Sequence, residues 1–278
     1  MTPANEPAFA LQGVSYAYAQ GPAALCGVTF GIGRGETVML LGANGAGKST
    51  LLRLMDVLMP PTEGRILAFG REVSPDLLRD AALSRWFRSR VGFVFQDADA
   101  QLFSPTVEEE LMFGPLHIGL TAGEARRRAY ELAASFDIER LMDRAPFRLS
   151  GGEKRRVALA CTLAVNPSVI LMDEPTTGLD PKSESWLIDM LHQLASAGKT
   201  IVAATHSLHL AAEVADRAIV LGQGSGLVAD GAAGAILDDL ELLERANLIH
   251  THAHAHDDDS HAHPHTHAGI HTHSEDGR

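Results

Sequence analysis

The sequence has no basic surplus and no long apolar run, and each absence excludes a class of protein. Lys and Arg number 23 against 35 Asp and Glu, so the formal net charge is −12 with histidine neutral. Such a chain offers no broad positive face to the phosphates of DNA or RNA, and we expect no nucleic-acid partner. No apolar stretch approaches the roughly 18 to 20 residues that span a bilayer, and the first residues lack the layout of a signal peptide. Any membrane role is therefore expected to come through a partner.

Cysteine is also scarce. Cys26 and Cys161 lie far apart in the chain and lack the spacing of metal ligands. This usage suits a reducing cytosol better than a disulfide framework, and we expect both to be small core residues. The hydrophobic fraction of 45% in 278 residues is ordinary for a globular protein, so most of the chain should fold.

Short apolar runs of strand length recur between longer helical stretches. They are continuous rather than alternating, which is typical of parallel strands buried on both faces. These runs cover residues 37–41, 91–95, 169–172, 200–204 and 218–221. Residues 9–18 and 27–32 come before them and are interpreted as an antiparallel pair. The pattern predicts an α/β fold.

Helical patterns begin at residues that cap helices well. Between residues 106 and 144 the character is helical, and we expect a helical insert at about 106–165 between strands of the sheet. Three serines or threonines are followed three positions later by glutamate, as in capping boxes, and one aspartate is followed by proline. These pairs are Thr106 with Glu109, Thr121 with Glu124, Ser150 with Glu153, and Asp180 with Pro181.

Histidine dominates the C-terminal end. From His250 onward, histidines alternate with small or acidic residues, and such a segment cannot bury enough apolar surface to fold. We therefore expect a main domain over residues 1–232, a helical extension over 233–249 and a disordered tail over 250–278. Neutral imidazole is a favoured ligand of divalent transition metals. The tail histidines that we expect to bind Co²⁺ or Ni²⁺ are His252, His254, His256, His261, His263, His265 and His267.

A glycine-rich loop has the sequence of a phosphate site. Residues 42–49, Gly-Ala-Asn-Gly-Ala-Gly-Lys-Ser, fit the P-loop pattern and lie between a predicted strand and a predicted helix. The glycines allow backbone N–H groups to converge on phosphate oxygens, Lys48 reaches the outer phosphates and Ser49 ligates Mg²⁺. We expect the nucleotide to be bound by Asn44, Gly45, Gly47, Lys48, Ser49 and Thr50.

Two adjacent acids follow the apolar strand at 169–172. Asp173 is expected beside the Mg²⁺, and Glu174 is expected to orient or deprotonate the attacking water. The alternative for acids at a strand end is a solvated turn, but the P-loop earlier in the chain favours the catalytic interpretation.

Four further segments resemble motifs of the ATP-binding cassette (ABC) ATPases. Residues 149–153, Leu-Ser-Gly-Gly-Glu, resemble the signature motif, and Gln96 resembles the glutamine of the Q-loop. Residues 178–180, Gly-Leu-Asp, resemble the D-loop, and His206 resembles the switch histidine. The order and spacing match the family over about residues 8 to 230. The resemblance implies the ABC ATPase fold, with a P-loop core sheet, an antiparallel β unit, a helical subdomain and ATP hydrolysis.

In that family the signature of one subunit closes over the γ-phosphate held by the P-loop of the other. The resemblance therefore implies a dimer with two shared sites, and a single chain should be a poor ATPase. The residues that it assigns to the shared site are Ser150, Gly151, Gly152, Glu153 and Asp180. Glu153 is a departure, because many members have glutamine there. We expect the change to be tolerated, since Glu153 suits a capping box and basic residues follow it.

Three other residues receive roles from the same resemblance. His206 is expected to contact the γ-phosphate, and Gln96 to contact the Mg²⁺ and the attacking water. Tyr18 resembles the aromatic residue that stacks on adenine, with core packing as the alternative.

A narrower resemblance points to one group of transporters. Residues 94–103, 106–110 and 113–115 resemble the ATPases of energy-coupling-factor importers. In that group the segment after the Q-loop receives coupling helices of a transmembrane subunit, so Gln101, Leu102 and Phe103 are candidates for the mechanical link, with a surface turn as the alternative. The implied partners are a transmembrane coupling subunit and a metal-binding membrane subunit, at the cytoplasmic face of the cell membrane.

The histidine-rich tail favours the cobalt and nickel members of the group. Cobalt uptake for cobalamin synthesis is our first expectation and would imply a homodimer, while a nickel importer, a vitamin importer and a heterodimer with a second ATPase stay open. A metal-chaperone GTPase would need an Asn-Lys-x-Asp element, which we do not find. ABC ATPases of DNA repair or translation carry coiled-coil insertions or two cores, and this sequence shows neither.

Overall fold

A six-stranded sheet forms the centre of the molecule. The computed structural model describes residues 6–19, 21–223, 226–256 and 259–266, the last two ranges by backbone alone from residue 250. The strand order is β10-β9-β3-β8-β7-β6, in which the five strands from β9 to β6 are parallel and β10 pairs antiparallel with β9. Their bounds are β3 Thr37–Leu41, β6 Val91–Val94, β7 Val169–Asp173, β8 Thr200–Thr205, β9 Arg217–Leu221 and β10 Leu227–Ala232. Every residue of β3, β6, β7 and β8 is buried, so the predicted α/β fold is confirmed.

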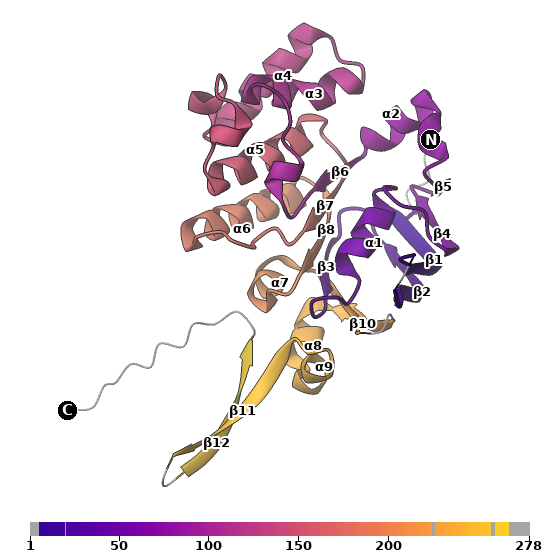
Figure 1. The fold of residues 1–278 in the computed structure, drawn as a ribbon, viewed down its shortest axis with the longest axis vertical. Coiled ribbons are helices and arrows are strands. Elements are labelled where there is room, and N and C mark those ends of the chain that lie inside the picture. The colour runs from indigo at the N-terminus through magenta and orange to yellow at the C-terminus, as the bar shows by residue number, and fades with distance from the viewer. Residues whose placement is uncertain (1–5, 20, 224–225, 257–258, 267–278) are drawn as a thin grey trace, which may run out of the picture.

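A second, antiparallel sheet covers the P-loop side of the core. Its order is β2-β1-β4-β5, with β1 Phe9–Ala17, β2 Ala23–Ile32, β4 Glu63–Ala68 and β5 Arg71–Val73. The sequence did not predict β4, β5 or β10, because they are short or mostly exposed and carry no continuous apolar run. Helix α1 (Lys48–Met55) lies between the two sheets, as Figure 1 shows, and its buried leucines join the core that both sheets share.

Most of the remaining helices form a layer on the other side of the central sheet. Helix α2 (Ala81–Arg88) instead packs on the side of the antiparallel sheet through Phe87, and two short helices form a C-terminal group. In Figure 1, α3, α4 and α5 stand together above α6, away from the antiparallel sheet. The helix bounds are α2 Ala81–Arg88, α3 Val107–His117, α4 Ala122–Ser135, α5 Gly151–Ala164, α6 Pro181–Ser196, α7 Leu208–Val214, α8 Ala233–Asp238 and α9 Leu240–Arg245. Short 3₁₀ turns occur at Leu77–Arg79, Ala98–Ala100, Glu139–Leu141 and Pro146–Arg148.

The expected helix caps are present. Thr121 and Ser150 each form a complete capping box at the start of α4 and α5, and Asp180 accepts backbone N–H bonds at the start of α6, where Pro181 is the first helical residue. At α3 only half of the expected box forms, because Thr106 accepts from the N–H of Glu109 without a reciprocal bond.

The expectation for Cys26 is wrong. Cys26 is exposed, because side chains alternate along β2 and the neighbouring Leu25 takes the buried position. Cys161 is partly buried against the core of the helical layer. Both cysteines are free thiols.

The start of the predicted disordered tail differs from expectation. Ile249–His256 (β11) pairs antiparallel with Asp259–Thr266 (β12), and this hairpin forms a sheet of its own. The alternation of histidine with small residues has the period of a strand, and backbone pairing needs no buried apolar surface. A hairpin with no third strand is only marginally stable in water. Residues 257–258 and 267–278, including His267, lie outside the described residues.

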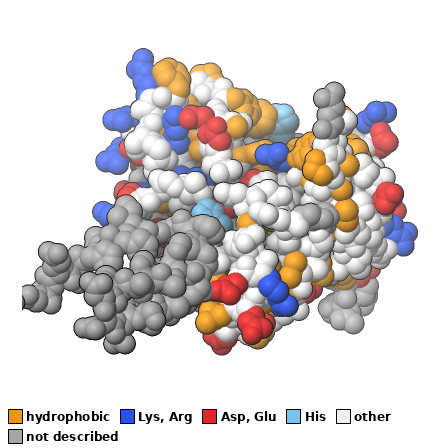
Figure 2. All heavy atoms as spheres, turned by 60° about the horizontal axis from the view of Figure 1, so that its bottom comes forward, with side chains coloured by type: hydrophobic (Ala, Val, Ile, Leu, Met, Phe, Trp, Pro, Cys, Tyr) orange, Lys and Arg blue, Asp and Glu red, His pale blue; other side chains and the backbone are white. Residues whose placement is uncertain are grey.

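Two further observations concern the helices and the surface of the molecule. Among the residues that the structure describes, no helix combines the length and the apolar character needed to cross a membrane. Figure 2 shows acidic and basic side chains interspersed over one face of the molecule.

Candidate active site

The phosphate loop joins the end of β3 to the start of α1. Gly47, the residue before α1, has φ of +91° and provides no side-chain cap, so the first N–H groups of the helix are open to an anion. A Cβ at Gly47 would lie 2.4 Å from the carbonyl oxygen of Ala24, and one at Gly42 would lie 2.6 Å from that of Leu221. The fold therefore requires glycine at both ends of the loop.

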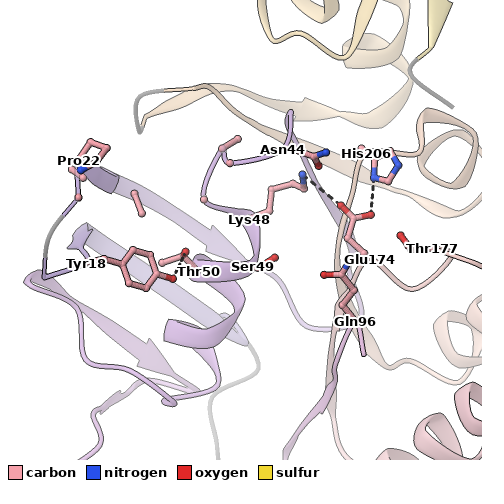
Figure 3. Close-up of a pocket in the computed structure, with 16 residues that line it drawn as sticks. Tyr18, Pro22, Asn44, Lys48, Ser49, Thr50, Gln96, Glu174, Thr177 and His206 are labelled. Atoms are coloured by element: carbon pink, nitrogen blue, oxygen red, sulfur yellow. Dashed lines mark hydrogen bonds and ion pairs between the residues drawn. The ribbon is translucent and has the colours of Figure 1, made fainter. Parts of the chain in front are cut away.

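A cavity of about 620 Å³ opens over this loop. Its volume suits a ligand of nucleotide size. Figure 3 shows the 16 lining residues, with Tyr18 and Pro22 on one side and Glu174 and His206 on the other. The predicted site residues that line it are Tyr18, Asn44, Gly45, Gly47, Lys48, Ser49, Thr50, Gln96, Glu174 and His206.

Glu174 is the centre of a buried polar network at one end of the cavity. Its Oε1 lies 3.5 Å from Lys48 Nζ, and its Oε2 accepts a hydrogen bond from His206 Nδ1 at 2.9 Å (Figure 3). Lys48 also donates to the carbonyl oxygens of Gly42 (2.7 Å) and Ala43 (3.3 Å). The Glu174 carboxylate thus lies next to Lys48, which is expected to hold the outer phosphates, and next to His206, which is expected to contact the γ-phosphate.

The backbone of Glu174 is strained. Its φ of +45° lies in the left-handed region, which costs a non-glycine residue roughly 1–2 kcal/mol. The chain holds this conformation through the bond from Glu174 N–H to the carbonyl oxygen of Ala204 at 2.8 Å, directly after the end of β7. Such strain is found at sites where the position of a side chain matters more than local stability.

Asp173 contacts the phosphate loop, although it is not one of the residues that line the cavity. Ser49 Oγ donates a hydrogen bond to Asp173 Oδ1 at 2.7 Å, which brings a hydroxyl and a carboxylate together. Burial raises the pKa of Asp173, while the bond from Ser49 and the cations Arg53 and Lys48 act in the opposite direction. An additional cation beside these oxygens would favour the ionised carboxylate, and hard oxygen ligands of this kind suit Mg²⁺.

Tyr18 stands at the far edge of the cavity. Its side chain is 44% exposed, which excludes the alternative of core packing. Its hydroxyl is 3.0 Å from Thr50 Oγ1, and its ring meets that of Tyr16 edge-on at 5.0 Å. These contacts hold the ring in place while leaving part of it open to a ligand.

The signature residues do not reach this cavity in their own chain. Ser150 caps the start of α5, and the first turn of that helix holds Gly151, Gly152 and Glu153. None of these four residues lines the cavity. Ser150 donates to Glu153 Oε2 through both its N–H and its hydroxyl, each at 2.9 Å. These bonds lower the pKa of Glu153. Asp180 likewise lies outside the cavity.

Arg155 is a further residue at the site, and the sequence assigned it no role there. Only 9% of it is exposed, and it donates to the carbonyl oxygens of Phe95 and Thr177, both at 3.2 Å. It therefore ties the residue before Gln96 to a residue that lines the cavity. Its place two positions after the signature was the available signal. The cavity wall at residues 21–24 offered none, because it consists of glycine, proline and alanine.

The segment after the Q-loop has two parts with different environments. Gln101 connects the end of β6 to α5, because its side chain accepts a hydrogen bond from Phe95 N–H at 3.2 Å and donates one to the carbonyl oxygen of Ala158 at 2.9 Å. Phe103 is 66% exposed and stacks edge-on against Phe113 beside a groove of about 320 Å³. Leu102 is partly buried against the helical core.

For the tail histidines within the described residues, the structure gives the backbone alone. The backbone of His252, His254, His256, His261, His263 and His265 belongs to β11 and β12, but their side chains lie outside what the structure describes.

Comparison with known proteins agrees with the fold and the motifs. The sequence pattern of the ABC transporter family matches residues 25–177. The nickel import ATP-binding protein NikO of Rhodobacter capsulatus is 45% identical over 87% of this chain and 96% of its own, and the cobalt import ATP-binding protein CbiO of the same organism is 44% identical over 87% and 85%. The energy-coupling factor transporter ATP-binding protein EcfA of Methanothermobacter thermautotrophicus is 40% identical over 86% and 75%.

Solved structures lead to the same family. CbiO1 from Clostridium perfringens, part of the complex cbiONQ, superimposes with a TM-score of 0.73 at 33% identity, covering 88% of this chain and 96% of that one. A dimeric ATP-binding cassette, MJ0796, bound to ADP and phosphate, gives 0.72 at 32% identity, covering 81% and 98%. The GTPase alternative is thereby set aside. This chain belongs to the ATP-binding subunits of ABC transporters and is an ATPase of the energy-coupling-factor type.

Proposed function

We propose that this ATPase drives a transition-metal importer, acting as a homodimer on the cytoplasmic face of the membrane, with Co²⁺ for cobalamin synthesis as the first candidate cargo. The observation that carries the proposal is an ABC cassette of this type with a histidine-rich C-terminal segment. Relatives named for nickel and for cobalt import are 45% and 44% identical, so Ni²⁺ is the second candidate. Import of a vitamin would not explain the histidines of the C-terminal segment.

In the proposed dimer, each ATP lies between the phosphate loop of one chain and the signature of the other. Asn44, Gly45, Gly47, Lys48 and Thr50 hold the phosphates, and Tyr18 stacks on the adenine. Ser150, Gly151, Gly152, Glu153 and Asp180 complete the site from the second chain. Support comes from the cavity, which contains the first group and not the second. One chain alone therefore offers an incomplete site.

We assign hydrolysis to Glu174, His206 and Gln96. In the structure Lys48 and His206 both face the Glu174 carboxylate. The phosphates of ATP would draw Lys48 away, because they carry more negative charge than one carboxylate. Glu174 would then be free to accept a proton from the attacking water, while His206 contacts the γ-phosphate.

Mg²⁺ fits the oxygens beside the phosphate loop. The Ser49 hydroxyl and the Asp173 carboxylate are 2.7 Å apart, and Gln96 lines the cavity together with Ser49. We propose that these three residues hold the ion. Bound there, Mg²⁺ would neutralise charge on the outer phosphates.

The groove beside Phe103 is our candidate for the mechanical link. An exposed Phe103 next to Phe113 offers apolar surface that a helix of a transmembrane coupling subunit would cover. A metal-binding membrane subunit would complete the importer. Gln101 and Leu102 support this surface from within.

Metal uptake by cells that express the whole transporter tests the cargo. We expect accumulation of labelled Co²⁺ that depends on this subunit, and an equal excess of unlabelled Co²⁺ should compete better than Ni²⁺. Stronger competition by Ni²⁺ would make nickel the cargo. If neither labelled Co²⁺ nor, in a parallel assay, labelled Ni²⁺ accumulated, the transition-metal proposal would be wrong.

We further propose that the tail binds Co²⁺ or Ni²⁺ through pairs of histidines on facing strands. Residues that are backbone partners across an antiparallel pair have Cα atoms about 4.5–5.5 Å apart, and a pair of histidines at that spacing is a suitable ligand set for one ion. The cross-strand histidine pairs are His250 with His265, His252 with His263, and His254 with His261. An ion bound by a pair would also stabilise the hairpin, since it joins the two strands.

Two double variants separate paired binding from binding by a disordered tail. H252A/H263A removes one cross-strand pair and leaves two, whereas H252A/H261A breaks two pairs and leaves one. Calorimetry with Ni²⁺ or Co²⁺ should therefore find about twice as many tight sites in the first variant. Interchangeable histidines would give equal losses, because each variant lacks two.

Deleting residues 250–278 should remove most metal binding while sparing ATP hydrolysis.

A further inference from the structure

The hydroxyl of Ser150 is engaged by a charged neighbour. It donates to Glu153 Oε2 at 2.9 Å, and the same oxygen also accepts the N–H of Ser150 at 2.9 Å. A hydrogen bond to an ionised carboxylate is about twice as strong as one to a neutral amide oxygen. Any other acceptor that needs the Ser150 hydroxyl must therefore compete with this carboxylate.

The carboxylate stays ionised and is only partly neutralised. Its bonds from Ser150 lower the pKa of Glu153, with smaller contributions from Arg140 and Arg144. Arg140 is the nearest cation, at 3.4 Å, but its side chain is 71% exposed, so solvent weakens the pairing. The first turn of α5 thus presents a negative charge next to the hydroxyl.

The start of α4 provides an internal comparison. Thr121 and Glu124 form the same box, in which Glu124 Oε2 accepts from Thr121 N–H at 2.8 Å and from its hydroxyl at 2.6 Å. The sequences are also alike, with Thr-Ala-Gly-Glu in one helix and Ser-Gly-Gly-Glu in the other. Capping therefore explains the geometry of both boxes. They differ in what they face, since Gly151 borders a small cavity that reaches Gln96 and Thr177, two residues of the nucleotide cavity.

We propose that Glu153 is a positioning residue that raises the ATP concentration at which two chains close. This inference rests on the proposed dimer, in which the Ser150 hydroxyl donates to the γ-phosphate held by the partner. Glu153 holds the same hydroxyl and repels the triphosphate, and both effects oppose closure. Glutamine at this position would keep the box through its amide oxygen and remove the charge.

The test compares E153Q with E124Q, each combined with E174Q to prevent turnover. Dimer formation is followed by light scattering as ATP with Mg²⁺ is titrated. E153Q should lower the half-maximal ATP concentration about five- to tenfold, the difference between a charged and a neutral hydrogen-bond acceptor. E124Q should leave it unchanged. Thermal unfolding without nucleotide should be alike in the two, since each alters one capping box.

The possible failures are distinct. If E174Q dimerises with ATP but E153Q shifts the curve no more than E124Q does, the role of Glu153 is refuted and the dimer stands. If E174Q does not dimerise at any ATP concentration, the proposed dimer fails and this inference fails with it. A higher ATP requirement in E153Q would also contradict the inference, because it would mean that the charge assists closure.

Discussion

E174Q is expected to reduce ATP hydrolysis by about 100-fold or more while leaving ATP binding intact. Gln is nearly isosteric with Glu and retains an oxygen that can face Lys48 or His206, so the cavity should keep its shape. The amide cannot accept a proton from water, and the step that releases phosphate is therefore slowed. Since the dimer would no longer consume its nucleotide, it should accumulate in the closed state.

Phosphate release and size-exclusion chromatography with ATP measure the two effects of E174Q. The matched control is E124Q, which makes the same chemical change at an exposed helix cap that does not line the cavity. E124Q should hydrolyse ATP at the wild-type rate and run as a monomer after turnover. Hydrolysis by E174Q at the wild-type rate would show that another group activates the water.

The second large effect is expected from S150R. A long cationic side chain at the first turn of α5 would fill the space where the proposed partner's γ-phosphate approaches, so hydrolysis should be almost abolished. Ser150 does not line the cavity of its own chain, and a single chain should therefore bind ATP with unchanged affinity. Fluorescent-nucleotide binding and phosphate release on the same samples separate the two results.

T121R is the control for S150R. It removes the capping hydroxyl from the same kind of box in α4, so each variant should lose about 1 kcal/mol of stability from its helix cap. Only S150R should lose hydrolysis. Equal activity in the two variants would contradict the shared site, and with it the interpretation of residues 149–153 as a signature.

Local sequence patterns predicted the parts of this protein that depend on near neighbours. The phosphate loop needs glycine where the backbone is left-handed or crowded, as at Gly47 and Gly42, and that requirement is visible in the sequence. The capping boxes of Thr121 and Ser150 link residues three positions apart, so they too were predicted. Continuous apolar runs identified β3, β6, β7 and β8, because strands buried on both faces need them.

Structural features that leave no local pattern in the sequence were not predicted. The edge strand β10 and the outer strands β4 and β5 are held by backbone pairing with neighbours, which leaves their side chains free to be polar. Exposure of Cys26 followed from strand alternation that began four residues earlier than expected. The pairing of β11 with β12 likewise depends on backbone hydrogen bonds rather than on apolar content.

The sequence by itself determined the fold class and the chemistry of each motif, since both follow from residue type and short spacing. Only the tertiary structure decided which motifs share one cavity. Lys48, Glu174 and His206 come from β–α junctions far apart in the chain and meet because the carboxyl ends of parallel strands share one edge of the sheet. Ser150 lies outside that cavity, because α5 begins in the helical layer. No short-range sequence pattern encodes the separation between Ser150 and the cavity of its own chain.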